Sequence, residues 1–346
     1  MVQQGAPGRL PGPIKHYLLG FERALDGDVL IYWSSHGPAD VFRSSPSARS
    51  RTQKGSPIDT TVIVGCGYLG KRVAALLHHA MSIPALAIVR REASARSLQE
   101  EGIQAVAMDL DSDLTFVPPP TDYRVLYLIP PPDTGSRDQR LRKFLEGLSA
   151  HPPLRMVYGG SSAVYGDCQG ALVDESHPVS RHFPVAGRRL DAEEAVKHYA
   201  HTHRTSAVIL RIAGIYGPGR LPLERLRAGR PVVRPSEAGV TNRIHVDDLA
   251  RICLAALEHP SPEGCYNVAD GHPTSTADFL RALAACAGLP PPPEVSLDTA
   301  LKSASPAEAR YLLESRRLDV TRMRRDLTPG WAPVVPSDIF RRDLGS

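Results

Sequence analysis

A glycine-rich loop between a short apolar run and an amphipathic stretch constrains this chain most strongly. Residues 61–64 (Thr-Val-Ile-Val) have the β-branched composition of a buried strand, and the apolar spacing after the loop is that of a helix. The loop itself reads Gly65-Cys66-Gly67-Tyr68-Leu69-Gly70. Glycines at this spacing permit a tight turn, leave room for a pyrophosphate and let the helix pack closely on the strand. We therefore predict a dinucleotide-binding loop formed by Gly65, Gly67, Tyr68, Leu69 and Gly70; the alternative is a tight turn without a ligand.

The same alternation of short apolar runs and helical stretches continues along the chain. Strands are predicted at 61–64, 85–89, 105–108, 124–129, 155–158 and 207–211, and helices at 71–80, 93–102, 139–150 and 191–202. Such alternation implies βαβ crossovers and a parallel sheet. After about residue 220 helices dominate, at 246–257, 276–287 and 306–314. The predicted fold class is therefore α/β, a doubly wound parallel sheet (Rossmann) with a small C-terminal substrate lobe.

Composition divides the 346 residues into three parts. Residues 1–58 contain a polar run at 43–54 and many prolines and glycines, so we predict a flexible N-terminal extension, with the apolar patch 29–33 as its one docking point. A dinucleotide-binding Rossmann domain is predicted at 59–220. A smaller substrate lobe and C-terminal tail is predicted at 221–346, interleaved with the sheet.

Charge and cysteine usage limit the partners that this chain can have. The formal net charge is +4, and residues 1–58 contribute +3 of it (seven basic minus four acidic residues). The remainder is nearly neutral, so we expect no nucleic-acid partner. The five cysteines are scattered without a CxxC pair, which favours a reducing compartment and no metal site. No apolar run approaches the roughly 20 residues of a membrane span. We expect a cytoplasmic protein with a small-molecule substrate and no membrane partner; a homodimer is left open.

The residues after the second and third predicted strands bear on the choice of cofactor. Arg90 and Arg91 stand where an NAD-binding protein usually places the acidic residue that binds the ribose hydroxyls. Two guanidinium groups suit a 2′-phosphate, so NADP is predicted, with NAD as the alternative. Asp109 and Leu110 are placed to flank an adenine ring; the alternative for Asp109 is an Asx turn that ends the strand.

Four segments together resemble the extended short-chain dehydrogenase/reductase superfamily, which includes the NAD(P)-dependent nucleotide-sugar epimerases and dehydratases. They are 61–70 with the glycine loop, 157–166 ending in Val-Tyr-Gly, 210–219 ending in Tyr-Gly-Pro-Gly, and 242–248 containing His-Val-Asp-Asp. The resemblance covers about residues 60–345. It implies an NADP-dependent oxidoreductase or an epimerase/dehydratase-like enzyme that acts on a small carbonyl or hydroxyl compound or on a sugar nucleotide.

The resemblance also assigns candidate site residues. Ser161 occupies the position of the catalytic serine, and Tyr165 of the Val-Tyr-Gly element is a second catalytic candidate. Arg243 and His245 are candidate substrate contacts, because their loop borders the substrate lobe.

The superfamily's tyrosine–lysine pair is absent, and the chain is therefore an atypical member. No tyrosine in this sequence is followed by lysine four residues later; Val185 or Ala186 stands at the tyrosine position, with Arg189 near that of the lysine. A phenol needs a nearby cation to act as a base at neutral pH, so the usual chemistry requires another route. The alternative function is a non-catalytic NADP(H)-binding sensor or scaffold.

Overall fold

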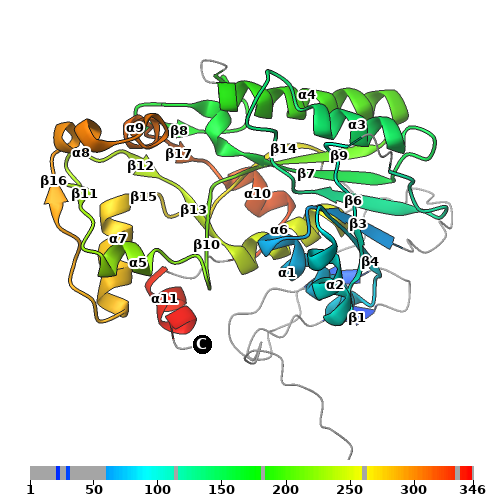
Figure 1. The fold of residues 1–346 in the computed structure, drawn as a ribbon, viewed down its shortest axis with the longest axis horizontal. Coiled ribbons are helices and arrows are strands. Elements are labelled where there is room, and N and C mark those ends of the chain that lie inside the picture. Colours follow the sequence, from blue (N-terminus) through cyan, green and yellow to red (C-terminus); the bar gives the residue numbers. More distant parts are fainter. Residues whose placement is uncertain are drawn as a thin grey trace, which may run out of the picture.

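The computed structural model describes residues 21–23, 29–31, 60–112, 116–180, 184–258, 263–331 and 336–344. Its centre is a seven-stranded sheet of order β14-β9-β7-β6-β3-β4-β5, parallel throughout (Figure 1). The strands are β3 (Thr60–Val64), β4 (Ala85–Val89), β5 (Gln104–Ala107), β6 (Tyr123–Tyr127), β7 (Arg155–Ser161), β9 (Ser206–Ile212) and β14 (Gly264–Val268). The predicted doubly wound α/β fold is confirmed.

The strand order reverses between β3 and β6. Strands β4 and β5 follow β3 toward one edge of the sheet, and β7, β9 and β14 extend from β6 toward the other edge. In an open parallel sheet, the loops after the two strands at such a reversal diverge and leave a crevice at the carboxyl edge, where ligands bind. The glycine-rich loop follows β3 directly, so it lies at this crevice.

Helices cover both faces of the sheet and complete two apolar layers. Figure 1 shows α3 (Gln139–Leu148) and α4 (Pro184–His203) on one side, and α1 (Tyr68–Leu76) and α6 (Val246–Glu258) on the other. Helix α1 continues as a π-helical turn at Leu77–Met81, and α2 spans Glu92–Glu100. The α3/α4 layer buries side chains such as Tyr127, Phe144 and Val196, and the α1/α6 layer buries Val73 and Leu249. The sheet is therefore shielded from water on both faces, as parallel sheets require.

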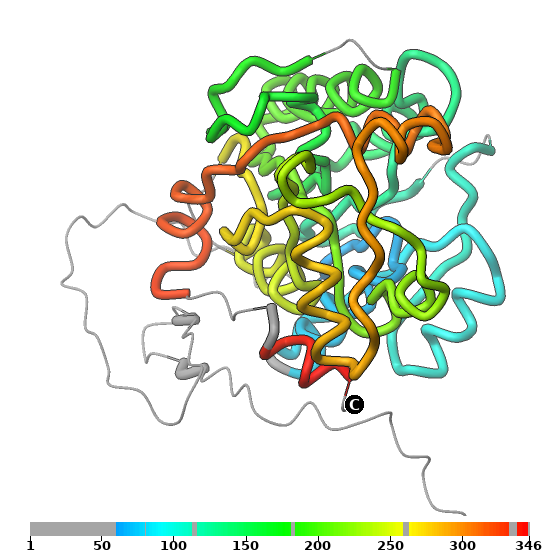
Figure 2. Tube along the Cα trace, turned by 90° about the vertical axis from the view of Figure 1, so that its left-hand side faces the viewer, coloured from blue at the N-terminus to red at the C-terminus, as the bar shows by residue number. Residues whose placement is uncertain are grey.

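The rest of the chain forms a lobe at one end of the sheet, at the left of Figure 1 and toward the viewer in Figure 2. Four small two-stranded pairs belong to it or join it to the sheet domain: β10 (Gly214–Tyr216) with β13 (Arg243–His245), β11 (Val232–Val233) with β16 (Glu294–Val295), β12 (Val240–Thr241) with β15 (Thr274–Ser275), and β8 (Leu172–Val173) with β17 (Arg317–Leu318). Its helices are α5 (Leu223–Arg227), α7 (Thr276–Cys286), α8 (Leu297–Ser303), α9 (Pro306–Leu313) and α11 (Pro336–Leu344). Helix α10 (Thr321–Asp326) lies instead beside β14 of the sheet (Figure 1), and a 3₁₀ turn at Ser162–Tyr165 follows β7. An aromatic cluster of Tyr216, Phe279 and Phe340 forms part of the lobe's own core.

Two differences from the sequence prediction concern the sheet and the helices that cover it. Helix α4 begins at Pro184 rather than at 191, because proline is tolerated in the first turn and the fold buries Ala186 and Arg188 along it. The edge strand β14 was not predicted, since its glycine and asparagine are poor strand formers and only pairing with β9 specifies it.

Residues 1–58 fall almost entirely outside the described part of the structure. Within them only the antiparallel pair β1 (Phe21–Arg23) and β2 (Val29–Ile31) is described. The flexible extension therefore stays a prediction. None of the described helices is long and apolar enough to cross a bilayer.

Candidate functional site

The three glycines of the loop after β3 have three different environments. Gly65 has φ +90°, and a Cβ there would lie 2.8 Å from Cγ1 of Ile129, so the turn itself demands glycine. A Cβ on Gly70 would lie 3.1 Å from the Gly65 carbonyl oxygen and 3.1 Å from Cγ2 of Ile63, so glycine permits the close approach of α1 to β3. A Cβ on Gly67 would meet no protein atom within 4 Å. The open space thus lies where a pyrophosphate would rest against bare backbone.

Helix α1 presents its N-terminus to the same space. Gly67 is its N-cap residue and no side chain caps it, so the first N–H groups of the helix, those of Tyr68, Leu69 and Gly70, stay available. These groups and the helix dipole favour an anion. The loop residues therefore fit the phosphates of a dinucleotide.

Tyr68 connects this loop to the loop after β10. Its hydroxyl donates to the carbonyl oxygen of Pro218 at 2.9 Å, and its ring lies 4.0 Å from the guanidinium carbon of Arg220 and 4.3 Å from that of Arg72. Arg72 in turn donates from Nε to Oδ1 of Asp247 at 2.9 Å. Since Arg220 also lines the main cavity described below, it joins the glycine loop to that cavity.

The residues predicted to select the cofactor lie at the same edge of the sheet. Arg90 and Arg91 directly follow β4 and are exposed, and Arg91 is the N-cap residue of α2. Asp109 follows β5 and forms an Asx turn, its Oδ1 accepting from the N–H of Asp111 at 3.0 Å. Leu110 is 5% exposed and packs in the core. Asp109 therefore has the turn geometry that was one of its two expected roles.

Ser161 ends β7 and begins the 3₁₀ turn that carries Tyr165. Its Oγ accepts the N–H of Ala163 at 3.2 Å, which fixes the hydroxyl oxygen and leaves its proton free to donate. The adjacent Ser162 is buried and lines the main cavity. On α4, Val185 is part-exposed, and Arg189 one turn later has no hydrogen-bond partner at Nε among the described residues. Burial lowers the pKa of the Arg189 guanidinium.

Tyr165 belongs to a buried polar network. Its hydroxyl donates to Oδ1 of Asn267 at 2.7 Å and accepts from Arg211 at 2.9 Å, and Arg211 pairs with Glu193 at 2.8 Å. Asn267 donates in turn to the Val173 carbonyl at 3.0 Å. Burial raises the pKa of Tyr165 to about 12. Both hydrogen-bonding directions of this hydroxyl are thus occupied, and the network ties β7, α4, β9 and β14 together.

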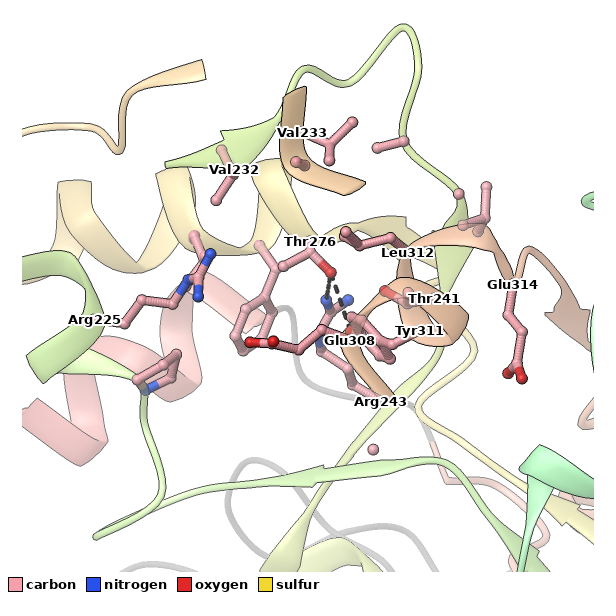
Figure 3. Close-up of a pocket in the computed structure, with 18 of the residues that line it drawn as sticks. Arg225, Val232, Val233, Thr241, Arg243, Thr276, Glu308, Tyr311, Leu312 and Glu314 are labelled. Atoms are coloured by element: carbon pink, nitrogen blue, oxygen red, sulfur yellow. Dashed lines mark hydrogen bonds between the residues drawn. The ribbon is translucent and has the colours of Figure 1, made fainter. Parts of the chain in front are cut away.

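A cavity of about 680 Å³ lies between the carboxyl edge of the sheet and the C-terminal lobe (Figure 3). Its lining is strongly cationic, since the charged side chains are Arg220, Arg225, Arg230, Arg243, Arg316, Glu308 and Glu314. Arg316 pairs with Glu314 at 2.7 Å. Among the described residues, none of the other four arginines has a carboxylate oxygen within 4.0 Å of its guanidinium nitrogens. The cavity therefore favours an anionic ligand.

Arg243 is the most buried of these cations, at 9% exposure. It donates to Oγ1 of Thr274 and Oγ1 of Thr276, both at 3.2 Å, and its guanidinium carbon lies 4.2 Å from the ring of Phe279. Figure 3 shows Tyr311 of α9 reaching the same threonine, with its hydroxyl 3.1 Å from Oγ1 of Thr276. Burial lowers the pKa of Arg243. A buried guanidinium here is thus hydrogen-bonded by neutral groups only.

His245 does not line the cavity, although Arg243 two residues earlier does. Its ring is buried, with Nε2 3.0 Å from Oδ2 of Asp343 on α11 and Nδ1 accepting the N–H of Asp247 at 3.2 Å. The pair attaches the C-terminal helix to the loop before α6. Among the described residues, no group of three or more His, Cys, Asp or Glu side chains is arranged to hold a metal ion.

Comparison with known proteins agrees with this arrangement. Residues 141–269 match the model of the NAD dependent epimerase/dehydratase family. These residues include the Ser161 turn, α4, the Tyr-Gly-Pro-Gly loop and the His-Val-Asp-Asp segment. Over this segment the comparison supports the resemblance to the extended short-chain dehydrogenase/reductase superfamily.

Individual proteins match this chain only in part. The chain is 33% identical over 157 residues to Protein YeeZ of Escherichia coli strain K12, covering 44% of this chain and 54% of that protein. The chain thus spans about half the length of this curated relative. It is 28% identical over 229 residues to a 3-diazoavenalumate denitrifying reductase of a Streptomyces species, covering 62% of this chain and 73% of that protein.

Solved structures share the fold over most of both chains. A conserved protein of unknown function from Silicibacter pomeroyi has a TM-score of 0.68 at 26% identity, covering 83% of this chain and 97% of that one. A UDP-glucuronic acid 4-epimerase from Bacillus cereus, solved with NAD, has a TM-score of 0.62 at 18% identity, covering 82% and 96%. At the latter identity the likeness shows the fold alone.

The sequence did not predict several of the residues that line the cavity. Arg220, Thr276 and Tyr311 come from three separate elements of the C-terminal lobe, and no short motif contains them. Arg220 directly follows the quoted Tyr-Gly-Pro-Gly segment, which was the one available signal.

Proposed function

We propose that this protein is an NADP(H)-dependent oxidoreductase, or an epimerase/dehydratase-like enzyme, that acts on an anionic carbonyl or hydroxyl compound; a sugar nucleotide is one such compound. One observation carries the proposal. A cavity with four arginines that have no close carboxylate in the described part of the chain opens at the same sheet edge as a glycine loop with free space over Gly67. A cofactor in that loop and an anionic substrate in that cavity would meet at the carboxyl ends of β7 and β9.

The chain's own residues provide the cofactor site. Gly65, Gly67 and Gly70 with the N–H groups of Tyr68 and Leu69 would hold the pyrophosphate, and when bound the cofactor supplies or accepts a hydride. Arg90 and Arg91 would pair with a 2′-phosphate, because charge-assisted bonds from guanidinium groups are roughly twice as strong as neutral ones. Asp109 and Leu110 would flank the adenine from the end of β5.

Ser161 is the proposed catalytic donor. Its oxygen is fixed by the N–H of Ala163, so its proton can be directed to a substrate carbonyl. Tyr165 has both its hydrogen-bonding directions occupied in the buried network, so we assign it the positioning of the Ser161 turn rather than contact with substrate. Val185 cannot ionise, and the proton must therefore come from water, from the substrate or from another side chain.

The proposed substrate contacts are assigned from the residues that line the cavity. Arg243 is the proposed substrate contact, because it is a cavity cation bonded only to neutral groups. His245 is assigned to positioning this loop through Asp343, which agrees with its absence from the cavity lining. We retain as further proposals a sheet domain at 59–220, a lobe at 221–346, a cytoplasmic location and a homodimer. Sedimentation of the purified chain would test the homodimer.

The test is oxidation of NADPH by the full-length chain with a panel of aldehydes, ketones and sugar nucleotides, followed by absorbance of the reduced nicotinamide. Turnover of an anionic member that Ser161→Ala largely abolishes would support the enzyme. The alternative is the sensor or scaffold, favoured by Val185 or Ala186 at the position of the usual tyrosine. Tight NADP(H) binding with no turnover across the panel would favour that alternative, and absence of cofactor binding would refute both.

A further inference from the structure

A helical hairpin, α8–α9, forms part of the cavity wall beside Arg243. No side chain of either helix is buried, although both are well formed, with side-chain N-caps at Ser296 and Ser305. The hairpin lines the cavity with residues that include Thr299, Glu308 and Tyr311. An element that buries so little is held weakly, because few buried contacts oppose its local movement.

One polar contact reaches from this hairpin to the cavity's buried cation. The hydroxyl of Tyr311 lies 3.1 Å from Oγ1 of Thr276, which accepts from Arg243 at 3.2 Å. Figure 3 shows the two bonds meeting at the threonine oxygen. Tyr311 is 51% exposed, which is unusual for a large aromatic side chain, and it lines the cavity. Among the described residues, the Tyr311 hydroxyl therefore makes the one hydrogen bond between α9 and Thr276.

The positive charge of Arg243 has no hydrogen-bonded carboxylate among the described residues. Arg243 is buried, and its bonding partners among the described residues are threonine oxygens, the Tyr311 hydroxyl and the face of Phe279; the Asp270 carboxyl acts on it only through space. A buried charge is stable only when well paired, so an anion entering the cavity would be a better partner than neutral hydroxyls. Such an anion would compete for Arg243 and would free the Tyr311 hydroxyl to donate to it.

We propose that Tyr311 is a specificity-determining residue: its hydroxyl, held beside Arg243 through Thr276, donates to the anionic group of the substrate and makes the cavity discriminate against neutral analogues. The inference rests on the proposed function, because it assigns Tyr311 to the substrate site. The shared chemistry is an oxyanion, and it has two sources, a phosphate or a carboxylate. Light packing of α8–α9 lets Tyr311 follow the anion without disturbing the sheet.

The experiment measures affinity by calorimetry on the full-length chain with NADPH present. One arm compares UDP with uridine, and the other compares cinnamate with its methyl ester. The ratio of anionic to neutral affinity is determined for the unmodified protein, for Tyr311→Phe and for Thr276→Val. Tyr266→Phe is the matched control, since it removes a phenol that bonds Asp326 and does not line the cavity. Thermal melting confirms that each variant is folded.

In at least one arm, the unmodified protein should prefer the anion, and Tyr311→Phe should lower that preference by about tenfold, as loss of one charge-assisted bond implies. The neutral member should keep its affinity within about threefold, and Tyr266→Phe should change neither value. A large preference that Tyr311→Phe leaves intact would overturn this inference and leave the proposed function standing. A ratio near one in both arms of the unmodified protein would overturn the anionic substrate class together with this inference. NADPH oxidation in the panel assay is a separate readout and would still decide whether the protein is an enzyme.

Discussion

Substitution of the loop glycines by alanine separates the ones that the fold requires from the one that a ligand requires. Gly65→Ala places a Cβ 2.8 Å from Cγ1 of Ile129 at a φ of +90°. The left-handed backbone costs an alanine about 1–2 kcal/mol, and a forced contact in a packed region costs about 1–3 kcal/mol more. Gly65→Ala should therefore lower the free energy of unfolding by about 2–5 kcal/mol.

Gly67→Ala should lower stability only slightly and should mainly weaken NADPH binding. Its Cβ would meet no protein atom, so the expected loss of stability is about 1 kcal/mol, the usual cost of alanine at an N-cap. The same methyl group would project into the space where the pyrophosphate is expected. NADPH affinity should therefore fall at least about tenfold, which is 1.4 kcal/mol.

The measurements are urea unfolding for stability and NADPH fluorescence titration for affinity. Gly102→Ala is the control for backbone strain alone, since Gly102 has φ +81° but no atom within 4 Å of its Cβ, and it lies in the turn before β5. It should cost less than Gly65→Ala and leave NADPH binding unchanged. If Gly67→Ala binds NADPH as well as the unmodified protein does, the cofactor does not rest on this backbone and the site assignment is wrong.

Four further outcomes are expected. Arg90→Ala with Arg91→Ala should weaken NADPH binding about tenfold or more and leave NADH binding nearly unchanged by calorimetry; equal affinity of the unmodified protein for both cofactors would contradict the NADP assignment. Ser161→Ala should lower the turnover rate about 10²–10³-fold with cofactor affinity within a few-fold; an unchanged rate would place the chemistry elsewhere. Tyr165→Phe removes one hydrogen bond from each of two buried side chains, Asn267 and Arg211, and should lower the free energy of unfolding in urea by about 1–3 kcal/mol, whereas no loss would show that the network is dispensable. Burial raises the pKa of Asp270 to about 6, so the folded state holds this proton more tightly than the unfolded state does. The free energy of unfolding should therefore decline as pH rises from about 4 through about 6. Asp270→Asn should reduce the difference in unfolding free energy between pH 4 and pH 7, and an unchanged difference would refute the assignment of this decline to Asp270.

The sheet was largely determined by local sequence. The five-residue run at Ala85–Val89 was predicted with its observed bounds, because β-branched and apolar residues bounded by loop residues specify a buried strand without help from the fold. The glycine loop was equally local, since its spacing, the preceding strand and the following helix all lie within about twenty residues. The three environments of Gly65, Gly67 and Gly70 follow from that spacing.

The tertiary structure decided what local pattern could not specify. Strand β14 exists because β9 supplies a parallel partner, and helix α4 extends to Pro184 because the fold buries its first turns. Tyr165 was selected from a motif, yet its partners lie 102 and 46 residues away along the chain. Arg243 and Tyr311 are separated in sequence and converge on Thr276 only in the folded chain. The cavity is made from such long-range contacts, and a substrate site of this kind is determined by packing between elements, because no single segment contains enough of its residues to form a pattern.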